Sequence, residues 1–214
     1  KPQKQLEIQP YFLTQYDTYE QELGNPFREG QEFNLNAGLD AKIGITNDLT
    51  LDLTINPDFG QVEADPAVIA LDGFQVFLQE KRPFFIENKN IFDYNFANNE
   101  DNLFYSRRIG RSPQGIIATQ KEDFVKRPQS STILGAGKFS GKTKNGWSLG
   151  ILESVTANEF AKIDNGTERK EVLAEPLTNY FVGRAQKDFN NRNSFLGAIV
   201  TATNRNTDEP QFTF

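Results

Sequence analysis

The sequence predicts an all-β protein built from antiparallel, up-and-down strands. Three observations support this prediction: long stretches in which apolar and polar residues alternate, turn residues between those stretches, and a composition rich in aromatic residues and glycine. The 214 residues include 19 Phe, 6 Tyr and 16 Gly, although only 37% of the chain is hydrophobic. A polar chain with this much Phe and Gly is more typical of sheets than of a helical bundle.

The clearest alternation covers residues 32–56, which we expect to form the first hairpin. From Glu32 to Thr46 the alternation is unbroken, with the period of a strand. Asn47-Asp48 then supplies a turn, and the alternation resumes as far as Asn56. One face is expected to carry the apolar residues Phe33, Leu35, Leu39, Ile43, Leu49, Leu51 and Leu53, and the other the polar residues Asn34, Asn36, Asp40, Lys42, Asp52 and Thr54.

The first arm of this hairpin is more than twice as long as a typical soluble strand of about 5–6 residues. This length suits a tilted strand that crosses a bilayer, with its apolar residues toward lipid and its polar residues toward a lumen. A long hairpin in a soluble sandwich, with its apolar face on a core, fits the same pattern. The hairpin alone therefore leaves both interpretations open.

Residues 131–214 repeat the alternation and predict further strands. The alternating stretches are 131–142, 147–155, 178–189 and 193–205. Asn145-Gly146 and residues 190–192 provide tight turns, whereas residues 158–176 are expected to form a long polar loop. Short turns that alternate with long loops are typical of an outer-membrane barrel, so the predicted fold is an antiparallel up-and-down outer-membrane β-barrel or its N-terminal part. The chain ends within a strand-like pattern, and we expect strands beyond that end.

The remaining stretches are less regular. Residues 1–31 are expected to be a lead-in segment. Residues 57–130 show no long alternation; within them, 69–82 could form a short helix and 104–113 a short basic strand or turn. An insertion of this length between strands is uncommon unless it is functional, and in a barrel it could fill the lumen as a plug.

Charge and residue usage exclude several functions. The net charge of −6 argues against a general nucleic-acid binder, which must neutralise phosphates. The sequence has no Cys and no His, which excludes disulfides and thiolate metal sites and removes the most frequent general base. We expect no catalytic residues, no metal site and no cofactor.

The stretch NPDFGQVEADP, residues 56–66, carries three close carboxylates, Asp58, Glu63 and Asp65. Clustered carboxylates can ligate calcium, but these do not match the usual calcium-loop spacing. A pair of carboxylates could also serve glycoside hydrolysis, although sequence spacing does not give their separation in space. The preferred interpretation is a polar loop that helps to hold the insertion in place.

A basic group follows, made of Lys81, Arg82, Arg107, Arg108 and Arg111. These side chains could bind carboxylates, phosphates or sulfates of a ligand. The preferred interpretation is that they pair within the protein, because a polar lumen can house such a network. The expected acidic partners are Asp58, Glu63, Asp65, Glu80 and Glu87.

Three motifs, GLDAKIGITNDLTLDLTINPDFGQVEADPAVI, EKRPFFIE and LFYSRRIGR, resemble a family of uncharacterised bacterial outer-membrane proteins. The resemblance is dense over residues 33–112. It implies a large β-barrel domain, usually downstream of a module similar to family-9 carbohydrate-binding domains, and a location in the outer membrane of a Gram-negative bacterium. It supplies no catalytic residues.

The expected function is therefore a non-enzymatic outer-membrane barrel in transport or surface assembly, related to glycans. Its expected partners are the lipid bilayer and other outer-membrane proteins or glycans, and no nucleic acid. The alternative is a soluble or surface-attached β-domain that binds or hydrolyses carbohydrate.

Overall fold

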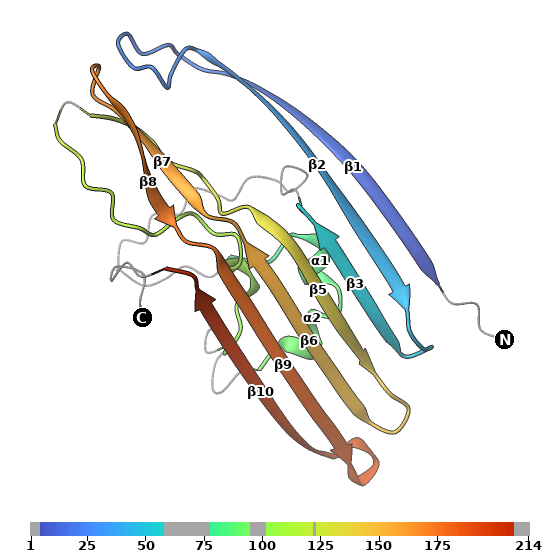
Figure 1. The fold of residues 1–214 in the computed structure, drawn as a ribbon. Coiled ribbons are helices and arrows are strands. Elements are labelled where there is room, and N and C mark those ends of the chain that lie inside the picture. Colours follow the sequence, from blue (N-terminus) through green and yellow to red (C-terminus); the bar gives the residue numbers. More distant parts are fainter. Residues whose placement is uncertain (1–4, 58–77, 95–101, 122, 208–214) are drawn as a thin grey trace.

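The computed structural model describes residues 5–57, 78–94, 102–121 and 123–207. The predicted all-β class with antiparallel sheets is confirmed, and the main sheet has seven strands (Figure 1). In sheet order these strands are β1 (Leu6–Thr18), β2 (Gln31–Gly44), β3 (Leu49–Ile55), β5 (Ile133–Lys142), β6 (Trp147–Thr156), β9 (Thr178–Phe189) and β10 (Ser194–Arg205). The sheet is open, since β1 and β10 are its two edges and no described strand joins them.

The hairpin expected over residues 32–56 is present as β2 and β3, with Leu39 opposite Ile55 and Lys42 opposite Asp52. The tail hairpins β5–β6 and β9–β10 follow the same alternation. Gly146 closes the β5–β6 turn with a φ of 80°, a left-handed conformation that glycine adopts easily. At the start of β5 a register shift between Ile133 and Gly135 breaks the expected parity, so Ile133 is buried and Leu134 is exposed.

The N-terminal stretch expected to be a lead-in segment contains a full strand. β1 has 13 residues and pairs with β2 along its whole length, from Leu6 opposite Ile43 to Thr18 opposite Gln31. Pro10 lies in the middle of it. Proline cannot donate to a ladder and is tolerated mainly on edge strands, which is the position that β1 occupies.

The prediction of a long polar loop over residues 158–176 is wrong. It contains a second hairpin, β7 (Glu159–Asp164) and β8 (Arg169–Glu175), which joins β4 (Phe124–Lys126) in a three-stranded sheet. This small sheet has its own core of Ile117, Ala161, Ile163 and Ala174. β7 and β8 are short and charged and contribute only Ala161, Ile163 and Ala174 to that core, so the hairpin depends on tertiary packing that local alternation does not reveal.

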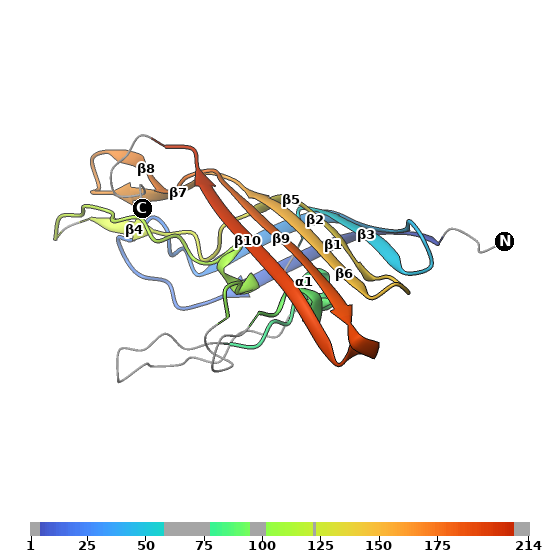
Figure 2. The same cartoon turned by 90° about the horizontal axis from the view of Figure 1, so that it is seen from below.

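Between β3 and β4 the described chain forms short helical turns: α1 (Pro83–Ile86), α2 (Lys89–Phe92) and the 3₁₀ turn η1 (Ser106–Arg108). Another 3₁₀ turn, η2 (Asn190–Arg192), joins β9 to β10. Most of the helix expected over 69–82 lies outside the described residues, and Leu78 to Arg82 are not helical. Residues 78–94 and 102–112, hereafter the inner segment, lie against one face of the main sheet (Figure 2).

Candidate functional site

The main sheet has two faces of opposite character. The inner face is the one covered by the inner segment, and it carries buried polar side chains such as Lys138, Thr54 and Ser140, which are at most 2% exposed. The outer face carries the alternate positions, where Phe12, Leu35 and Val200 are 62–79% exposed. The polarity of this sheet is thus the reverse of that in a soluble sheet, where the apolar face is the covered one.

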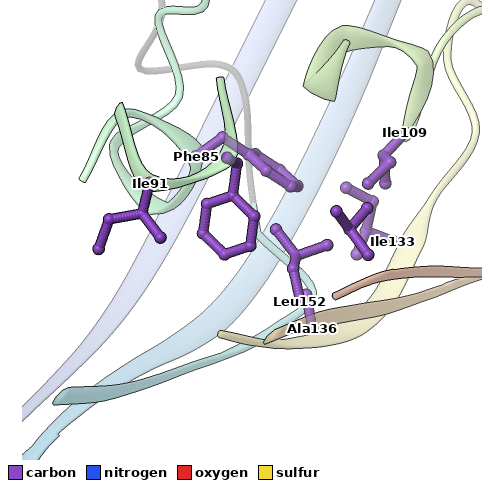
Figure 3. Close-up of a cluster of buried hydrophobic side chains, with 8 residues drawn as sticks. Phe85, Ile91, Ile109, Ile133, Ala136 and Leu152 are labelled. Atoms are coloured by element: carbon purple, nitrogen blue, oxygen red, sulfur yellow. The ribbon is translucent and has the colours of Figure 1, made fainter. Parts of the chain in front are cut away.

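An apolar cluster attaches the inner segment to the sheet. Phe85 points toward Leu152 of the sheet, and Ile109 lies next to Ile133 (Figure 3), while Ile91 packs over Gly150 of β6. Phe92 and Val182 complete the buried cluster. The inner face is therefore polar along β2 and β3 and locally apolar where this segment is seated.

Within the inner segment, Glu80 and Arg82 form a buried ion pair. Arg82 donates from Nε and Nη2 to the two carboxylate oxygens of Glu80, both at 2.7 Å. Its other contacts are the backbone oxygens of Ile109 and Ser106, at 2.6 and 2.8 Å, and the ring of Phe85 at 4.2 Å. The bonds to Ser106 and Ile109 connect the start of the segment to its end, so Arg82 helps to fix the fold of the segment.

The pKa of Glu80 reflects this environment. Burial alone would raise the pKa of this carboxyl group, but the hydrogen bonds and the charge of Arg82, together with the hydroxyl of Ser106, outweigh burial and leave the pKa below its ordinary value of 4.5. Glu80 is therefore held as a carboxylate, which suits a structural ion pair rather than a proton donor.

A second charged group lies between the segment and the sheet. Lys138 of β5 is opposite Asp52 of β3, which is opposite Lys42 of β2, so the three form a row across the inner face. Lys138 lies 3.6 Å from Asp52 and donates to the backbone oxygens of Phe84 and Glu87. The carboxylate of Glu87 pairs with Lys42. The sheet thus holds the segment by charge as well as by apolar contact.

Arg184 of β9 makes a third connection. It donates to the backbone oxygens of Ile91 and Asp93 and lies 5.6 Å from the ring of Tyr94. Gln186, two residues along the same face of β9, accepts from Arg184 at 2.9 Å. Two cations of the sheet, Lys138 and Arg184, therefore bind the carbonyl ends of α1 and α2.

Three cavities surround these connections. One of about 240 Å³ lies between Phe85, Phe92 and Lys138, and one of about 150 Å³ between Phe84 and Lys42. The third, of about 430 Å³, is lined mainly by polar groups, which include Asn88, Asn90, Ser140, Ser148, Lys142 and Arg184. Each cavity is bounded by the inner segment on one side and by the sheet on the other.

The structure brings together some of the residues that the sequence singled out. Glu80 and Arg82 pair with each other, and Glu87 pairs with Lys42 rather than with an arginine. The backbone N–H of Lys81 donates to Glu80. Asp58, Glu63 and Asp65 lie outside the described residues, so their expected role as partners of the basic group stays a prediction.

Three arginines were also expected to join that network, namely Arg107, Arg108 and Arg111, and their pairing with the acidic residues stays a prediction. Arg107 donates to the backbone oxygen of Gln79 at 2.9 Å, and burial lowers its pKa. Arg108 is exposed. Arg111 is partly buried, and its Nε has no hydrogen-bond partner among the described residues.

Sequence reasoning missed Lys138, Arg184 and Ser106. Lys138 and Arg184 could have been found, because both lie on the polar parity of their strands, as Lys42 and Asp52 do on theirs. Ser106 lies in a short turn with no periodicity, and its hydrogen bond to Glu80 depends on contacts 26 residues apart in sequence.

Within the described ranges, no group of three or more acidic residues is placed to hold a metal ion. No helix among those residues is long and apolar enough to cross a membrane. What the arrangement can do chemically is hold charges in fixed pairs along a polar wall.

The fold and this site define a class: an antiparallel sheet with a polar inner face, an apolar outer face and a short helical segment fixed on the polar side. A family model described as "Domain of unknown function (DUF5916)" matches residues 2–211, and the chain therefore belongs to this family. No curated protein and no solved structure matches the chain.

Proposed function

We propose that this chain forms part of the wall of an outer-membrane β-barrel, with the inner face toward the lumen and the outer face toward lipid. The single observation that carries this proposal is the reversed polarity of the main sheet. Exposed single apolar residues are ordinary, but a whole sheet face of them marks a surface that binds something apolar. Lipid is the partner that fits a face extending across neighbouring strands.

The connections between strands support the same proposal. Residues 45–48, 143–146 and 190–193 are short turns, and all three lie at one end of the main sheet (Figure 1). At the other end the connections are long, and two of them, β3–β5 and β6–β9, supply the strands of the small sheet. Outer-membrane barrels have short turns on the periplasmic side and long loops on the extracellular side.

The charged row on the inner face is also accounted for by a lumen. Asp52 and Lys138 are too polar to face lipid, and each would be costly to bury without its partner. On the lumen side they can pair with each other beneath the inner segment, as they do in the structure. We propose a non-enzymatic role in transport or surface assembly, in which the inner segment narrows the lumen.

Paired substitutions in β3 test this proposal. Leu51 belongs to the outer face, while Thr50 belongs to the inner face and lines the largest cavity, which has room for a longer side chain. Leu51→Arg should reduce the stability of the protein in lipid vesicles by about 2–4 kcal/mol, as charges do near a bilayer midplane, and Thr50→Arg should reduce it far less. Equal tolerance of both changes, in a protein that stays soluble without detergent, would instead favour the soluble β-domain.

A further inference from the structure

Residues 82–94 form a strap across the inner face whose attachment differs from that of every strand. Its backbone hydrogen bonds join it to itself or to Leu103, and none joins it to a strand of the described sheet. Removing the strap from the face would therefore break no rung of the sheet. Besides the ion pair between Lys42 and Glu87, three side chains of the main sheet hold it by hydrogen bonds: Lys138, Arg184 and Ser140.

Two cationic side chains of the main sheet hold the two helical turns of the strap in the same way. Lys138 donates to the carbonyls of Phe84 and Glu87 around α1, and Arg184 donates to those of Ile91 and Asp93 around α2. The last carbonyls of a helix have no partner within the helix and carry its partial negative charge, so a cation there is favourable. Each cation also lies near a ring of the strap.

The junction between the two turns is the third attachment. Asn88 has a φ of 54°, and its side-chain amide donates to the Ser140 hydroxyl at 2.9 Å. Ser140 is fully buried beneath it. The accessibility of Ser140 therefore reports whether the middle of the strap is in place.

A hollow in the wall receives α2. Gly150 of β6 is buried, and a methyl group added there would lie 2.8 Å from Ile91 and 2.9 Å from Phe92. Real side chains do not approach so closely, and the glycine is what lets these two residues seat on the sheet. A side chain at this position should lift α2 without altering the outer face.

All three cavities lie along this strap, and residues of the strap line each of them. Glu87 borders two of them, Phe85 and Phe92 the first, and Asn88 and Asn90 the largest. We propose that the strap is a detachable gate: when residues 82–94 lift from the inner face, the three cavities join into one continuous passage along it. The apolar contacts of Phe85, Ile91 and Phe92 make the closed position the resting one. Only the use of that passage for transport rests on the proposed function.

Thiol labelling can detect this motion, because the chain has no natural cysteine. We would place single cysteines at Ser140→Cys, beneath the strap, and at Ser154→Cys, which is equally buried on the inner face but has no hydrogen bond to the strap. The folded full chain is treated with a small maleimide under native conditions. Position 140 should be labelled at least about ten times faster than position 154, because lifting the strap is easier than unfolding the sheet.

Gly150→Val, combined with each cysteine, should raise the labelling rate at 140 and leave the rate at 154 unchanged. Gly137→Val is the matched control, since Gly137 lies on the outer face of β5, and it should change neither rate. If Gly150→Val does not fold, Arg184→Gln removes one of the two cation anchors and should act in the same direction. Equal labelling of 140 and 154 in the parent background would overturn the gate, because the strap would then leave only when the sheet unfolds. Neither result depends on insertion into a bilayer, so a failed gate and a failed membrane assignment are distinguished.

Discussion

At the scale of single residues, the Glu80–Arg82 ion pair is the feature of the inner segment whose burial most depends on both partners being present. Both side chains are less than 10% exposed, and the guanidinium is surrounded by Glu80, two carbonyl oxygens and an aromatic ring. An ion removed from water remains stable only while its partner is present. The net attraction within the pair therefore adds little to the free energy of unfolding, whereas removing one partner should lower that free energy substantially.

Neutralising Glu80 tests this dependence. Glu80→Gln should reduce the free energy of unfolding by about 3–5 kcal/mol, because it removes the carboxylate that pairs with the buried guanidinium of Arg82. The change is measured by urea unfolding in detergent micelles. Glu168→Gln is the control: Glu168 is exposed, and its effect should stay within about 0.5 kcal/mol. A loss at Glu80 no larger than that of the control would contradict the account of the pair.

The same carboxylate predicts a pH dependence. Because the folded pKa of Glu80 is lowered below its ordinary value of 4.5, its contribution to stability is complete above pH 4.5 and is lost as the pH falls through the lower folded pKa. Unfolding measured between pH 7 and pH 3 should show stability decreasing below pH 4.5. In Glu80→Gln this part of the decrease should be absent. If the stability of the variant and of the parent protein fell in parallel with pH, Glu80 would not be the group responsible.

Residue identity alone could predict only part of this site. Acidic and basic residues at 80–82 and 87 were singled out because they cluster in sequence, and Glu80 and Arg82 do pair. The pairing of Glu87 with Lys42 joins residues 45 positions apart. The partner of Glu87 depends on how the inner segment lies on the sheet, and a local sequence pattern does not predict that placement.

At the scale of elements, β1 shows how a strand can be held at an edge. Tyr11 lies over Gly38 of β2, and its hydroxyl donates to the backbone oxygen of Asn56, just past the end of β3, at 2.8 Å. A single ring thereby connects three strands. A methyl group added to Gly38 would lie 2.2 Å from the Tyr11 hydroxyl oxygen, so the ring requires a glycine beneath it.

Gly38→Ala should displace this ring and destabilise the protein by about 1–3 kcal/mol, as overpacking usually does. Hydrogen exchange should locate the loss in β1, whose amides should exchange faster while those of β6 and β9 do not. Gly137→Ala is the matched control, because an added methyl there would meet only a side-chain carbon at 3.4 Å. Uniform acceleration across all strands would show that Tyr11 does not act locally.

Elements were predictable where one face of a strand is apolar over many residues. The alternation identified β2, β3 and the tail hairpins from sequence, since a two-residue period leaves few other structures. It failed for β1, where Pro10 and the inner-face Leu13 interrupt the pattern, and for β7 and β8, which are short and charged. Those strands exist because neighbouring strands offer them hydrogen bonds and a core.

At the scale of the whole molecule, the arrangement of polarity is the main result. Buried lysine, aspartate, serine and threonine line one face of a seven-stranded sheet, and exposed phenylalanine, leucine, isoleucine and valine cover the other. A soluble protein with this outer face would expose a large apolar surface to water, which promotes aggregation. The proposed bilayer on that side and lumen on the other would suit the polarity of both faces.

The most direct test is a cysteine scan of β3, since the chain has no cysteine of its own. Single cysteines at positions 50 to 54 are labelled with a small environment-sensitive dye in the unfolded protein, which is then folded into lipid vesicles, and dye emission is measured at each position. Our account predicts a two-residue period, with Leu51 and Leu53 in lipid and Thr50, Asp52 and Thr54 in a polar environment. Dyes at 51 and 53 that report water as strongly as those at 50 and 52 would contradict it.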